Sequence, residues 1–78
     1  MGNERLREAQ AILRLGRQTD SAETMSKQSY RFGVGLYTIQ CWQRAKGKVP
    51  SDKQWQKLLE YKQAVLDGTL PDLPGYLE

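Results

Sequence analysis

The chain has 78 residues, a hydrophobic fraction of 38% and a formal net charge of +3, which suit one small globular domain with a single core. No apolar run approaches the roughly 20 residues that cross a bilayer, and the first ten residues lack the apolar stretch of a secretory signal. A lone cysteine, Cys41, excludes an internal disulfide and favours a reducing, cytoplasmic location.

The composition also argues against an enzyme or a metal-binding protein. The chain has no histidine and only one cysteine, which excludes a Cys–His nucleophile and the usual zinc ligand sets. The GVG run at residues 33–35 lacks the lysine and the strand context of a phosphate-binding loop. We therefore expect no catalytic residue, no metal and no cofactor.

The positive charge is concentrated in the middle of the chain. Residues 1–24 carry four basic and four acidic side chains, whereas residues 25–57 carry seven basic and one acidic. Residues 58–78 carry one basic and four acidic side chains. A charge run is often only a solvated face, but this concentration favours nucleic acid as the partner.

The first predicted helix covers residues 3–15. Its apolar side chains recur at helical spacing, and Asn3 is a plausible N-cap. These apolar residues are Leu6, Ala9, Ile12 and Leu13. Gly16 is expected to end the helix.

The second predicted helix has two candidate starts and ends at Phe32. Asp20 with Glu23 resembles a capping box, and Thr24 is an alternative cap. Gly33 follows Phe32, where a left-handed residue would end the helix.

The third predicted helix covers residues 36–46. Ile39 and Trp42 lie three residues apart and therefore share one face. The preceding VGLYTI run has some β character, but its position directly after a glycine favours a helix start. Gly47 is expected to end this helix.

The fourth predicted helix begins after Ser51 as N-cap and ends at Gly68. Its apolar stripe consists of Trp55, Leu58, Leu59, Val65 and Leu66. The sequence thus predicts an all-α, compact four- to five-helix domain over residues 1–68. Residues 69–78, with two prolines, form a tail that is a candidate dimer contact.

Residues 25–46 meet the requirements of a helix-turn-helix. Such a motif needs a small residue in its first helix, a glycine in the turn, apolar residues flanking the turn, and apolar residues that fix the second helix. These positions are occupied by Ser29, Gly33, Phe32 with Val34, and Ile39 with Trp42.

With Gly47 and Pro50 downstream, these residues make the chain resemble the phage-repressor helix-turn-helix family, which includes lambda repressor, Cro and xenobiotic-response-element-like proteins. The resemblance spans residues 25–59. It implies a sequence-specific regulator of transcription, typically a repressor of a phage or mobile element, that binds double-stranded DNA as a homodimer. The chain departs from the family at Gln28, where an aliphatic residue is usual, and at Leu36 and Tyr37, where polar residues are usual.

The outward face of the third helix carries the expected base contacts. A glutamine pairs with adenine and an arginine with guanine, while a leucine suits the thymine methyl group. The expected base contacts are Leu36, Tyr37, Gln40, Cys41 and Arg44. The expected phosphate contacts are Ser26, Lys27, Arg31, Lys46 and Lys48. An alternative places Leu36 and Tyr37 in the core or in a dimer contact.

Two rival functions remain open. Excisionases and architectural DNA-binding factors carry similar Gly-Val and Ile-x-x-Trp helices, but they usually continue into a β-wing, whereas residues 51–66 predict a helix. The other rival is a protein-binding antitoxin or inhibitor. The expected homodimer uses the fourth helix and the tail, because so small a core cannot cover all their apolar groups. Alternatively, the tail folds back over the first helix.

Overall fold

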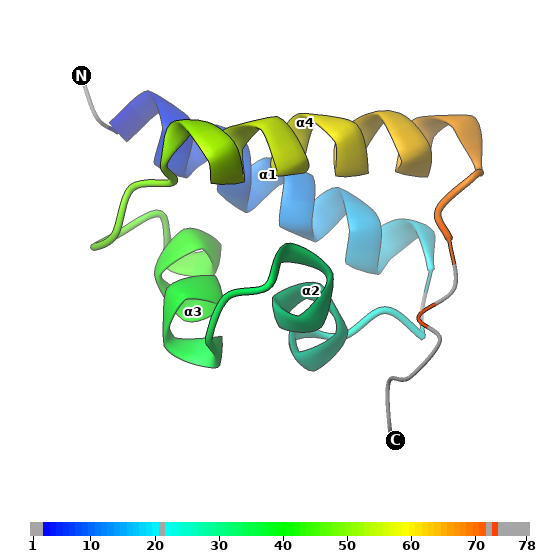
Figure 1. Ribbon diagram of the computed structural model, residues 1–78, viewed down its shortest axis with the longest axis horizontal. Helices are drawn as coiled ribbons and strands as arrows, with labels where there is room; N and C mark the ends of the chain where they lie inside the picture. Colours follow the sequence, from blue (N-terminus) through cyan, green and yellow to red (C-terminus); the bar gives the residue numbers. More distant parts are fainter. Residues whose placement is uncertain (1–2, 21, 72, 74–78) are drawn as a thin grey trace.

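The computed structural model describes residues 3–20, 22–71 and 73 of the chain. These residues form four helices, α1 (Asn3–Thr19), α2 (Met25–Phe32), α3 (Leu36–Arg44) and α4 (Asp52–Asp67), and no strand. The predicted all-α class is confirmed. The long helices α1 and α4 contact each other and run in the same general direction, with the shorter α2 and α3 beneath them (Figure 1). No helix in this part of the chain is long and apolar enough to span a bilayer.

The core lies between the α1/α4 pair and the α2/α3 pair. Trp42 is completely buried, and its ring meets Phe32 edge-on with 5.8 Å between the ring centroids. Phe32 meets Tyr61 in the same way at 5.1 Å. The other buried apolar residues are Leu6, Ala9, Ile12, Leu13, Ile39, Cys41, Leu58 and Val65. The predicted burial of Trp42 is confirmed, whereas Trp55 is only partly buried.

The first helix is longer than the sequence predicts. Gly16 does not end α1, which continues to Thr19. A Cβ atom at Gly16 would collide with the hydroxyl of Tyr61 on α4. The glycine is therefore present because two helices approach closely, and not because the backbone turns.

The start of α2 follows one of the two predicted alternatives. Thr24 is the N-cap, and its hydroxyl accepts a hydrogen bond of 3.2 Å from the Lys27 N–H. Gly33 ends the helix with φ of 66°, as predicted. The end of α3 differs from the prediction, because the helix stops at Arg44. Ala45 adopts the left-handed conformation there, with φ of 54°.

The fourth helix begins and ends as predicted. Ser51 and Gln54 form a capping box, in which each side chain bonds the other residue's backbone N–H. Gly68 ends the helix with φ of 71°. Two members of the predicted apolar stripe, Leu59 and Leu66, are nevertheless exposed on the surface.

The described part of the tail packs against its own chain. Leu70 contacts the core, and the Pro71 carbonyl accepts a hydrogen bond of 2.7 Å from Arg31 of α2. Leu73 lines a hollow together with Arg31 and Tyr61, whereas residues 74–78 of the expected dimer contact lie outside the described residues.

Candidate nucleic-acid interface

Helices α2 and α3 are joined by a short turn, residues 33–35, and pack against each other. The Val34 N–H donates to the Ser29 carbonyl at 3.1 Å, which holds the turn against the end of α2. Ile39 and Trp42 direct one face of α3 into the core. The opposite face of α3 is consequently turned toward solvent.

The solvent face of α3 carries four of the five expected base contacts. Leu36 is 47% exposed and Tyr37 is 66% exposed, so neither belongs to the core. Arg44 is exposed and Gln40 is half-buried. Cys41 is the exception. It is buried beneath the loop that follows α3, so the expectation that its thiol contacts a base is wrong.

Tyr37 lies beside Cys41, Arg44 and Lys48. A hydrogen bond with Cys41 raises the pKa of Tyr37, and the nearby charge of Arg44 opposes that shift. The phenol therefore stays neutral at physiological pH. The Nζ atom of Lys48 lies 5.8 Å from the centroid of the Tyr37 ring, within range of a cation–π contact. These contacts connect the start of α3 with the loop that follows it.

Three cations surround the end of α3. Arg44, Lys46 and Lys48 are exposed, and none forms an ion pair with a carboxylate in the described part of the chain. Of the other expected phosphate contacts, Ser26 is exposed at the start of α2 and Lys27 is half-buried. The three unpaired cations therefore form a positive surface continuous with the outward face of α3.

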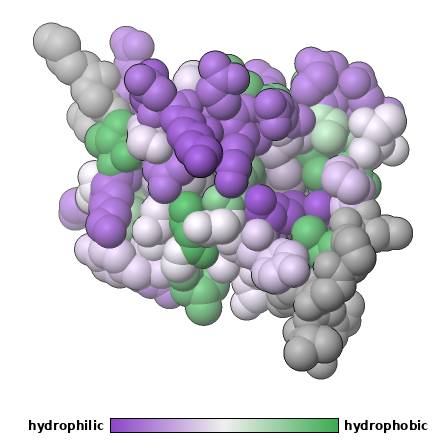
Figure 2. All heavy atoms as spheres, viewed as in Figure 1, coloured by the Kyte–Doolittle hydropathy of each residue, from purple (hydrophilic) through white to green (hydrophobic). Residues whose placement is uncertain are grey.

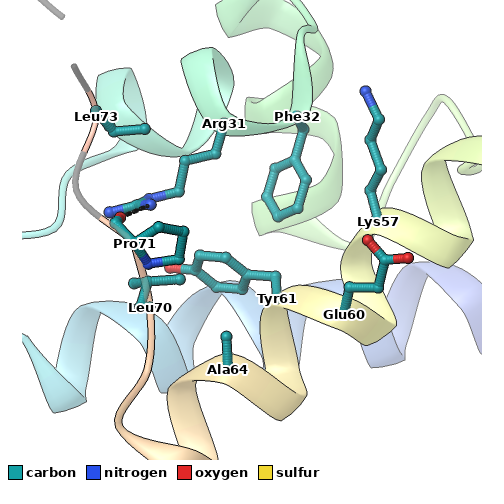
Figure 3. Close-up of a pocket in the computed structure, with 9 residues that line it drawn as sticks. All are labelled: Arg31, Phe32, Lys57, Glu60, Tyr61, Ala64, Leu70, Pro71 and Leu73. Carbon is teal, nitrogen blue, oxygen red and sulfur yellow. Dashed lines mark hydrogen bonds between the residues drawn. The ribbon is translucent and has the colours of Figure 1, made fainter.

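Arg31 does not belong to this surface, so its expected phosphate role is wrong. Its side chain is only 12% exposed and bonds both carboxylate oxygens of Glu23, at 2.8 and 3.2 Å. Its Nη1 atom donates to the Pro71 carbonyl (Figure 3). Because each of its three guanidinium nitrogens donates a hydrogen bond to its own chain, Arg31 fixes α2 to the tail.

Sequence reasoning missed the buried polar cluster around Arg31, which consists of Glu23, Gln28, Arg31 and Tyr61. The Tyr61 hydroxyl donates to Glu23 at 2.7 Å, and Gln28 donates to Tyr61 at 3.2 Å and to the Leu13 carbonyl at 2.9 Å. Burial raises the pKa of Tyr61. The sequence feature that could have indicated this cluster is Gln28, a polar residue where phage repressors usually have an aliphatic one.

The exposed apolar side chains do not gather in one place. In Figure 2, hydrophilic side chains cover much of the surface over α4, and apolar groups appear between them and along the lower edge. The large exposed apolar residues are Tyr30, Leu36, Tyr37, Val49, Leu59 and Leu66. Leu59 and Leu66 are seven residues apart on α4 and so share one side of that helix.

Comparison with known proteins adds no assignment: no protein-family model matches the sequence, and no curated protein or solved structure matches the chain. The residues of the chain itself therefore carry the functional argument.

Proposed function

We propose that the chain binds double-stranded DNA, with α3 in the major groove and the loop after α3 against the backbone. One observation carries the proposal: Arg44, Lys46 and Lys48 are exposed and without carboxylate partners in the described part of the chain, beside the outward face of α3. A helix of nine residues with such cations at its end suits the width of the major groove and the charge of phosphate.

Sequence specificity comes from the outward side chains of α3. Gln40 has the donor and acceptor pair that adenine requires, and Leu36 provides an apolar contact for a thymine methyl group. The resemblance to phage repressors makes a small transcriptional repressor of a phage or mobile element the best-supported role. Such a protein acts in the cytoplasm, where its operator lies.

A second copy completes the proposed site. One helix reads only a few base pairs, so a two-fold operator with two chains is the usual solution. Leu59 and Leu66, 43% and 60% exposed, offer an apolar contact on α4 for that second copy. Their place on α4 leaves α3 uncovered.

The decisive experiment is selection from randomised duplexes, followed by binding measurements across a salt series. We expect one preferred sequence and a steep loss of affinity with salt. Replacing Lys53 with alanine removes one positive charge from α4 instead of from α3 or the loop that follows it, and should leave both results unchanged. A chain that selects no sequence and binds duplexes weakly at every salt concentration would refute the proposal.

The protein-binding alternative predicts a different outcome. Exposed Leu36 and Tyr37 at the start of α3 would suit an apolar groove on a protein partner. Such a complex would change little with salt, because few charges would be neutralised. An excisionase-like role is less well supported, since α4 follows the loop where those proteins have a β-wing.

A further inference from the structure

A small hollow of about 180 Å³ lies between the outward face of α3 and the loop that follows it. The residues that line it are Tyr37, Gln40, Cys41, Arg44, Lys46 and Gly47. They come from the start and the end of one helix and from the next loop, so the hollow exists only because the loop folds back toward α3.

The lining of this hollow is rich in hydrogen-bond donors and contains no carboxylate. Arg44 and Lys46 bring two positive charges, and Tyr37 and Gln40 add a hydroxyl and an amide. The hollows beside α4 differ, because Glu60 lines one and Glu4 with Glu8 lines another. Charge complementarity therefore directs an anion to the hollow on α3.

The backbone holds the loop in the shape that forms the hollow. Ala45 and Gly47 both have positive φ, at 54° and 95°, and turn the chain back over the end of α3. A Cβ atom on Gly47 would lie 2.9 Å from the Cys41 Sγ atom, so only glycine lets the loop approach this closely. The Nζ atom of Lys48 lies 5.8 Å from the Tyr37 ring centroid, so the loop and the start of α3 meet on this side of the hollow.

We propose that this hollow holds one phosphodiester group of the bound nucleic acid. The inference rests on the proposed function and refines it, because it moves Arg44 and Tyr37 from base reading to phosphate binding. A guanine edge takes a single bidentate arginine. A guanine bound by Arg44 would leave the charge of Lys46 uncompensated. A phosphate attracts both Arg44 and Lys46 and accepts a hydrogen bond from the Tyr37 hydroxyl. Base reading then falls to Leu36 and Gln40.

The first test uses duplex binding by Arg44→Gln and Lys46→Gln, with Lys53→Gln as the matched control. Each of the first two variants should flatten the dependence of log affinity on log salt by about 0.9 and leave the selected base sequence unchanged. The control should change neither. If Arg44→Gln keeps the wild-type slope and loses preference at one base pair, Arg44 reads a base. That result overturns the phosphate site while duplex binding itself stands.

The second test uses inorganic phosphate alone and does not depend on DNA. Backbone amide signals of Cys41, Lys46 and Gly47 should shift and saturate as phosphate is added, relative to chloride at equal ionic strength. The shifts should disappear in the Arg44→Gln/Lys46→Gln double variant and persist in Lys53→Gln. Equal shifts in the wild type and the double variant would overturn the site. Localised shifts in a wild-type chain that binds no duplex would keep the anion site and refute the proposed function.

Discussion

Replacing Arg31 with alanine distinguishes a structural role of this residue, in which it pairs with a buried carboxylate, from a role in contacting DNA phosphate. In the structure, Arg31 neutralises Glu23, whose side chain is only 1% exposed. The variant would leave that carboxylate buried without its cation, which typically costs about 3–5 kcal/mol. The Pro71 contact adds about 1 kcal/mol to the loss.

That loss is large relative to the whole stability of the domain. A 78-residue domain has an unfolding free energy of roughly 4–12 kcal/mol. We therefore expect Arg31→Ala to be largely unfolded or to unfold at a much lower urea concentration. Fluorescence of the buried Trp42 reports the transition, and Lys46→Ala, on the surface, should stay within about 0.5 kcal/mol of the wild type.

A double variant distinguishes the loss of the ion pair from a general failure to fold. Glu23→Leu/Arg31→Met removes both charges and should recover much of the stability that Arg31→Ala loses, because no unpaired charge remains buried. If Arg31→Ala instead unfolds like the wild type and flattens the salt slope of duplex binding, Arg31 lies on the DNA-binding surface and the cluster has been misread.

Three further predictions concern the core and the recognition face. Gly16→Ala should destabilise the fold by about 1–3 kcal/mol because its methyl group meets the Tyr61 hydroxyl, and Tyr61→Phe should relieve part of that loss in thermal melts. Burial raises the pKa of Tyr61 in the folded state above its ordinary value of 10.0. Its contribution to stability is therefore complete below pH 10 and is lost as the pH rises from there toward the folded pKa. In urea titrations, the free energy of unfolding should fall less at alkaline pH for Tyr61→Phe than for the wild type. Gln40→Ala should cost roughly 1–3 kcal/mol on the preferred duplex and relax one position of the selected sequence, and an unchanged selection would show that Gln40 does not read a base.

Much of the fold could be predicted because local signals and tertiary packing agree. Ser51 and Gly68 bound α4 as expected, since a capping box and a left-handed glycine act within one helical turn. Gly16 misled the prediction for the opposite reason. Its role depends on Tyr61, 45 residues away in the sequence, and no local pattern reveals that the two helices touch there.

The exposure of the expected site residues was predicted only in part. Helical spacing correctly placed Leu36 and Tyr37 on the outward face of α3. It also placed Cys41 there, because a helical wheel contains no information about the loop that covers one side of α3. Arg31 was assigned to phosphate because composition counts cations without their partners, and the partner Glu23 belongs to a different element.

Ion pairs inside the protein also determine how strongly its affinity for DNA should depend on salt. Residues 25–57 carry a net charge of +6 (seven basic, one acidic), which alone would suggest a salt slope of about five. Arg31 is neutralised inside the molecule, which leaves Arg44, Lys46 and Lys48 as the unpaired cations around the end of α3. At about 0.9 per phosphate contact, these three give a slope near three for each bound chain. A measured slope near five per chain would mean that lysines outside this surface also contact the backbone. A slope below one would remove the electrostatic support for DNA as the partner.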